Sequence, residues 1–147
     1  MKIKSNERVL DFAPVSYQFP ELTKLHKDYN EWDANWVTAR FSYSDGKGVQ
    51  GDETDACVLT FEMARFIKAL KGLLQGETDR ASLDTEEPYF KMTAAKEGDA
   101  YTVTAGYQRS VAQNDLALFE VRAAYDEKEL ARMVEELEEE WKRFPKR

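Results

Sequence analysis

The chain has very few of the residues on which metal and thiol chemistry depend. Its 147 residues include one cysteine, Cys57, and one histidine, His26. A lone cysteine excludes a disulfide within the chain, and two such ligands are too few for a structural zinc site, which takes four. Cys57 lies in the apolar run 56–59, whereas His26 lies in a charged connector. We therefore predict a buried, unreactive thiol rather than a catalytic pair.

Other signatures of catalysis and cofactor binding are also missing. The glycine-containing segment 45–48 precedes a predicted strand, so it is typical of a hairpin turn and not of a phosphate-binding loop. The acidic stretches 51–55 and 84–87 lack the ligand spacing of a calcium loop. We predict no enzyme, no cofactor and no metal site. Glycosidase-like carboxylate pairs stay open, because 28 acidic residues allow many pairs and nothing singles one out.

Long apolar runs and positive charge are both scarce. No stretch approaches the roughly 18 apolar residues that cross a bilayer, and no apolar segment follows the charged start, so we expect a cytoplasmic protein without membrane contact. Only 21 Lys and Arg stand against 28 Asp and Glu, giving a net charge of −7. That field repels phosphate, so we expect no direct nucleic-acid binding. It favours a basic protein partner, although solubility alone accounts equally well for mild acidity.

The residues that are abundant predict a single α+β domain over residues 1–147. Hydrophobic residues make up 42% of the chain and aromatic residues 12%, enough for one core. Alternating apolar positions predict strands, and spacing of three to four predicts helices. The expected strands are one bent edge strand or two short ones over 7–19, a hairpin over 36–43 and 49–59, and three more at 88–94, 101–107 and 116–124.

Two amphipathic helices complete the predicted fold. The first begins near Thr60, a plausible N-cap, and ends before Gly76. The second begins after Asp126, which forms a capping box with Glu129, and ends at Pro145. Because the connections have hairpin length, we predict an antiparallel sheet of about five to seven strands with both helices packed on one face.

Two features are candidates for binding a partner. Between Asp126 and Glu140 the last helix has eight acidic residues and two basic ones, so Glu135, Glu138 and Glu139 could form a docking face or simply a solvated one. The segment Trp32-Asp33-Ala34-Asn35-Trp36 can shape a turn through its Asp and Asn side chains. Its tryptophans either pack inside or, if exposed, anchor a partner, so Trp32 and Asp33 join the candidate set.

Five short motifs in a fixed order carry a resemblance to a known family. They are Tyr17-Gln18-Phe19-Pro20, Asp33-Ala34-Asn35-Trp36-Val37, Cys57-Val58-Leu59-Thr60, Glu86-Glu87-Pro88 and Arg143-Phe144-Pro145. Together they resemble the WapI-type immunity proteins of bacterial contact-dependent, polymorphic toxin systems. The resemblance implies a cytoplasmic antitoxin that binds and neutralises a cognate toxin domain without catalysis. Where that toxin is a nuclease, its active face is basic, which suits an acidic inhibitor.

The resemblance implies no particular contact residues, so the candidate set above depends on charge and aromatic content alone. The alternative is that the chain is a domain that binds a small ligand or serves as a scaffold. The sequence leaves open the identity of the partner, the true interface and the oligomeric state.

Overall fold

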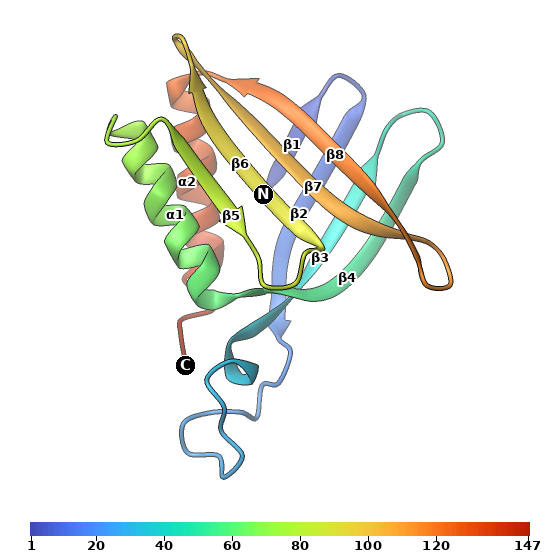
Figure 1. Cartoon of the computed structure of the whole chain (residues 1–147), viewed down its shortest axis with the longest axis vertical. Helices are drawn as coiled ribbons and strands as arrows, with labels where there is room; N and C mark the ends of the chain where they lie inside the picture. Colours follow the sequence, from blue (N-terminus) through green and yellow to red (C-terminus); the bar gives the residue numbers. More distant parts are fainter.

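The computed structural model describes residues 1–147 as four strands and a helix, followed by a second set of four strands and a helix (Figure 1). Each set of strands forms its own antiparallel sheet, in the order β1-β2-β3-β4 and β5-β6-β7-β8. The bounds are β1 Lys2–Ser5, β2 Arg8–Tyr17, β3 Trp36–Ser44, β4 Gln50–Leu59, α1 Thr60–Leu74, β5 Arg80–Asp84, β6 Phe90–Glu97, β7 Ala100–Ala112, β8 Asp115–Tyr125 and α2 Glu127–Trp141, with a short 3-10 helix at Asp33–Asn35.

The predicted α+β class is confirmed, but the single sheet of five to seven strands is wrong. The structure has eight strands in two sheets. The sequence pattern predicted too few strands because it missed β1 and β5. Each of these strands is short and buries only one or two side chains, which is too few to reveal an alternation. Since β1 pairs with β2, the latter is an inner strand and not the expected edge strand. The expected bend is present as a register shift after Pro14.

The core lies where the inner faces of the two sheets meet each other and the helices. The alternation predicted for β3 is confirmed, since Val37, Ala39, Phe41 and Tyr43 are all buried. Helix α1 packs along β5 and beside α2, and β1 lies against β8 (Figure 1). Neither helix is long and apolar enough to cross a membrane.

The helix ends agree with the sequence pattern in two places out of four. Asp126 accepts a hydrogen bond from the Glu129 amide at 2.8 Å and donates its own amide to the Glu129 carboxylate at 2.9 Å, which confirms the capping box. Gly76 has φ +73° after α1, as a helix-ending glycine should. The pattern misplaced the start of α1 by one residue: the N-cap is Leu59, and Thr60 is the first helical residue. The predicted end of α2 at Pro145 is also wrong, since the helix ends at Trp141 and an irregular turn leads on to Pro145.

Gly51 allows a close approach inside the first sheet. It pairs with Tyr43 on the neighbouring strand, and the Tyr43 ring lies directly over its backbone. A Cβ at position 51 would lie 2.5 Å from the Tyr43 Cζ, which no side chain tolerates without a shift. The Tyr43 hydroxyl then donates a hydrogen bond to the Glu53 carboxylate on β4. Because Gly51 has no side chain, the Tyr43 ring can lie over it and reach the Glu53 carboxylate.

We predict that Gly51→Ala lowers the free energy of unfolding by about 1–3 kcal/mol, because the Tyr43 ring must move out of its packed position. Urea unfolding monitored by tyrosine and tryptophan fluorescence measures this. The exposed Thr54→Ala on the same strand serves as control. Equal stability of the two variants would contradict the role assigned to Gly51.

Candidate functional site

The five motifs that carry the family resemblance lie together in the structure, where they hold the chain in place. The buried Asn35 is at the centre: its amide donates to the Glu31 carbonyl at 2.7 Å, and its oxygen accepts from the Thr60 hydroxyl at 2.7 Å. The Tyr17 hydroxyl donates to the Pro145 carbonyl at 2.5 Å. These bonds join the connector after β2 to the start of α1 and to the segment after α2.

Glu62 connects the remaining motif, Glu86-Glu87-Pro88, to the same hydrogen-bond network. Its carboxylate accepts hydrogen bonds from the backbone amides of Leu59 and Glu86, at 2.8 Å and 2.7 Å. Burial raises the pKa of Glu62, although these two donors act in the opposite direction. Unpaired buried polar groups are costly, so a network in which both Glu62 oxygens are satisfied stabilises the junction between the two halves of the chain. The hydrogen-bonded residues of these motifs thus maintain the fold.

The acidic face predicted on α2 is partly neutralised within the molecule. Glu135 is exposed, but Glu138 forms an ion pair of 2.6 Å with Lys71 of α1, and Glu139 pairs with Lys142. The Lys71 ammonium lowers the pKa of Glu138. Such exposed pairs add little stability, but they reduce the negative field that these two acids present.

Trp32 packs on helix α1, beside α2. Its ring is 51% exposed and packs edge-on against Phe61 at 5.4 Å. Phe61 and Glu138 both line a hollow of about 340 Å³ between α1 and the end of α2, which we call the helix groove. Its other lining residues are mainly apolar: Thr60, Ala64, Ile67, Trp141, Lys142, Phe144, Pro145 and Lys146. Phe61 of α1 therefore contacts Trp32 and also lines the hollow that Glu138 of α2 borders.

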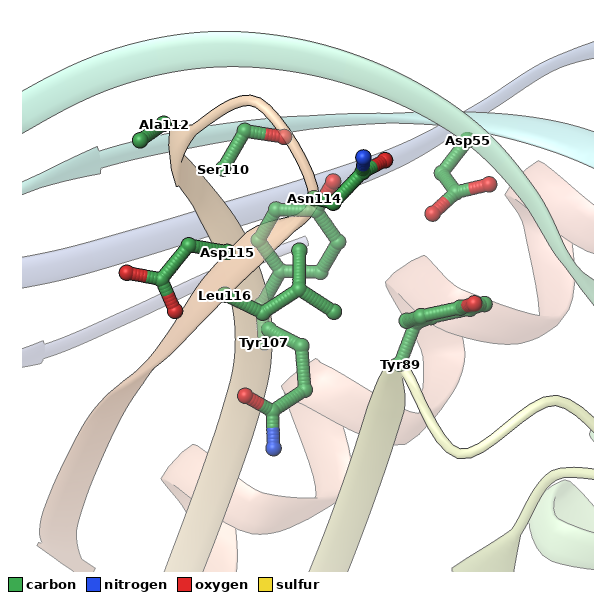
Figure 2. A pocket seen from close by; sticks show the side chains of 9 residues that line it. Asp55, Tyr89, Tyr107, Ser110, Ala112, Asn114, Asp115 and Leu116 are labelled. Carbon is green, nitrogen blue, oxygen red and sulfur yellow. The ribbon is translucent and has the colours of Figure 1, made fainter.

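Asp33 is oriented differently and lines another depression. Two hollows, of about 510 Å³ and 350 Å³, share Asp55 and Tyr89 and together form what we call the acidic groove. It runs from the β7–β8 hairpin past the edge strand β4 to the connector that carries Asp33, and Figure 2 shows its larger half. The lining residues are Gln18, Phe19, Asp33, Trp36, Asp55, Ala56, Glu87, Tyr89, Tyr107, Gln108, Ser110, Ala112, Asn114, Asp115 and Leu116.

The lining of the acidic groove has charge of only one sign. Asp33, Asp55, Glu87 and Asp115 contribute carboxylates, and no lysine, arginine or histidine is present. Burial raises the pKa of Asp55, and the negative charges of Glu87 and Glu53 add to the effect, against one hydrogen bond from the Ala56 amide. No ion pair with a lysine or arginine compensates Asp55. Its ionised form is therefore poorly stabilised in the free protein.

Glu53 determines how the two walls of the groove meet. Its carboxylate on β4 accepts hydrogen bonds from the Tyr107 hydroxyl at 3.3 Å and from the Ser110 amide at 3.1 Å, both on β7. It also accepts the bond from Tyr43 within its own sheet. Burial and the nearby Glu53 charge raise the pKa of Tyr107, which keeps its hydroxyl protonated as a donor. Glu53 thus connects the two sheets through Tyr107 and Ser110, which line the groove.

Sequence reasoning missed an apolar patch on the β7–β8 hairpin. Val111, Leu116 and Leu118 are each 43–46% exposed there. The signal was present in the strand pattern, because Ala117 and Phe119 were assigned to the inner face and their neighbours must then point outward. What the pattern could not show is that this hairpin borders the acidic groove.

The two residues considered for thiol chemistry lie in different settings. Cys57 is buried on β4, and burial raises the pKa of its thiol, which fits the predicted inert side chain. His26 lies in the connector and accepts a hydrogen bond from the Asp28 amide at 3.2 Å. No group of three or more His, Cys, Asp or Glu side chains is arranged to hold a metal ion.

Asp55 and Asp52 on the same strand should affect stability with opposite signs. Because the folded pKa of Asp55 is raised, the unfolded chain loses this proton first, and stability falls as the pH rises above 3.8. We predict that Asp55→Asn matches the wild type at acidic pH and becomes the more stable protein near pH 7. Arg40 and Ser42 lower the pKa of Asp52 to about 2, so Asp52→Asn should be the less stable protein near pH 7.

Thermal unfolding of both variants between pH 3 and pH 7 measures these differences. A loss of stability in Asp55→Asn near pH 7 would show that its carboxylate is favourably paired after all, and would contradict the assignment.

Comparisons with known proteins place the chain in a family. A search of curated proteins finds no match. A solved structure described as crystal structures of Trypanosoma brucei MRP1/MRP2 is similar over 88% of this chain and 81% of that chain, with 14% identity and a TM-score of 0.40. That likeness is too weak to carry an inference. The model of the immunity protein WapI-like family matches residues 2–145, nearly the whole chain. The chain belongs to the WapI-like immunity protein family.

Proposed function

We propose that this protein binds a cognate toxin domain and neutralises it by stoichiometric contact, without catalysis. Membership of an immunity protein family over residues 2–145 is the observation that supports this most directly. The formal charge of −7 supports a basic partner, such as the active face of a nuclease toxin, and disfavours direct contact with nucleic acid. The proposed place of action is the cytoplasm, where such a toxin would reach its target.

The helix groove and the acidic face beside it form the first proposed contact surface. Glu135 offers free negative charge, and Glu138 and Glu139 can exchange their internal lysine partners for those of a toxin. Trp32 offers a large, half-exposed ring supported by Phe61, which is the kind of anchor that dominates many protein interfaces. Asp33, next in sequence, extends the negative surface toward the acidic groove.

Such a surface affects the speed of capture more than the final affinity. Complementary charge can raise an association rate well above the 10⁵–10⁶ M⁻¹s⁻¹ that is roughly typical of neutral pairs. Rapid capture matters for an antitoxin, because an enzyme toxin turns over substrate until it is bound. The apolar part of the helix groove would then slow dissociation.

We predict that a toxin domain is encoded directly upstream of the gene for this chain, and that the chain protects cells from that toxin. The two are co-expressed, and growth is compared with cells that express the toxin domain alone. A matched control expresses Gly51→Ala, which retains the surface residues but is expected to be less stable. Growth arrest despite soluble, folded wild-type protein would refute the proposed function.

We also predict that Glu135→Lys, Glu138→Lys and Glu139→Lys together slow association with the toxin domain by about ten-fold at low salt and reduce its salt dependence, with little effect on folding. Stopped-flow mixing at several salt concentrations measures this. A control with the same change in charge reverses Glu77, Asp79 and Asp99, which are exposed at the other end of α1 and in the β6–β7 turn. Equal rates for the two triple variants would remove α2 as a docking face.

A further inference from the structure

We propose that the acidic groove receives a lysine or arginine side chain of the toxin domain, with the apolar β7–β8 hairpin forming the adjoining contact. This inference depends on the proposed function and adds a second surface to it. It assigns Asp55 the role of the acid that pairs with the incoming cation.

The first support is the distribution of unpaired charge over the molecule. Outside the groove, three acids on the surface pair with basic residues, namely Asp52 with Arg40, Glu97 with Arg122 and Glu31 with Lys146, and others, such as Glu135, are unpaired but exposed to solvent. The four acids of the groove have none. A partly buried carboxylate beside other negative charges is unfavourable in the free protein, and such groups are found where a ligand supplies the missing charge.

The second support is the chemistry of the walls around Asp55. The partly exposed ring of Tyr89 lines the same hollow, and Figure 2 shows the Asp55 carboxylate directed from β4 toward it. The Tyr107 ring is buried and stacked on Phe41, so Tyr89 is the ring that a cation can reach. An aromatic ring attracts a cation through its negative face, and a carboxylate can accept two hydrogen bonds from a guanidinium. The side-chain oxygens of Ser110 and Asn114, which also line the hollow, can accept hydrogen bonds from the other N–H groups of the incoming side chain.

The third support is the hairpin that borders the groove. Val111, Leu116 and Leu118 expose large apolar side chains on one short element. An apolar patch beside a polar, charged hollow has the composition of a protein interface, in which apolar contact provides affinity and the charge pair provides specificity. Leu116 belongs to both, because it also lines the groove.

Charge identifies the toxin rather than a second copy of this chain as the occupant. A second copy would bring another net charge of −7, and its own groove would place carboxylates against carboxylates. Like charges brought together at an interface are strongly unfavourable, whereas a basic toxin supplies the cation that the groove lacks.

The test measures binding of purified variants to the toxin domain encoded directly upstream, by surface plasmon resonance. We expect Asp55→Asn to raise the Kd about 10- to 100-fold, mainly through faster dissociation, because it leaves the toxin cation unpaired. Asp52→Asn is the matched control on the same strand and should bind like the wild type. Leu116→Ser with Leu118→Ser should raise the Kd about ten-fold or more.

Three results have distinct meanings. Weakened binding by Asp55→Asn that melts no lower than the wild type supports the groove, since loss of fold cannot then explain it. A double-mutant cycle should couple Asp55 to one lysine or arginine of the toxin and to no other. Wild-type binding that Asp55→Asn leaves unchanged overturns the groove and leaves the proposed function intact. Wild-type protein that does not bind the toxin overturns both.

Discussion

The contact between the two sheets is the interaction on which the rest of this structure depends. The rings of Phe41 and Tyr107 stack at 4.0 Å with an angle of 6° between them, and Phe12 stacks on Phe90 at 4.5 Å. Each pair joins a strand of the first sheet to a strand of the second. Aromatic burial of this extent provides a large share of the core energy, and the stacking geometry fixes how far apart β3 and β7 lie. That spacing brings Glu53 to Tyr107 and leaves the acidic groove open beside them.

Around this core, the residues that stabilise the fold and the residues proposed to bind a partner are mostly different. Asn35, Thr60 and Glu62 satisfy backbone and side-chain hydrogen bonds at the junction of the two halves, and they belong to or adjoin the motifs that resemble the family. The proposed binding residues lie outside that network or at its rim. A scaffold stabilised in this way can keep its fold while its surface changes, because exposed substitutions away from packed groups cost little stability.

The two proposed surfaces differ in how their negative charge is held. On α2 the acids are solvated and two of them are paired, so their effect on a partner is long-ranged and sensitive to salt. In the groove the carboxylate of Asp55 is partly buried and unpaired, so its effect is short-ranged and depends on an exact fit. The first suits the approach of a basic toxin, and the second suits its retention.

Sequence alone determined the local features of this protein. Alternation and spacing located β3, β4, β6, β7, β8 and both helices, and the Asp126 capping box followed from two residues three positions apart, because such signals depend only on neighbours in the chain. It also anticipated the acidic surface, the inert Cys57 and the family. Tertiary structure alone decided that the strands divide into two sheets and that β1 and β5 complete them, since their few buried side chains give no periodic signal. It also decided that Trp32 packs on Phe61 of α1 while Asp33 lines the same groove as Asp55, because burial and pairing depend on residues brought together from distant parts of the chain.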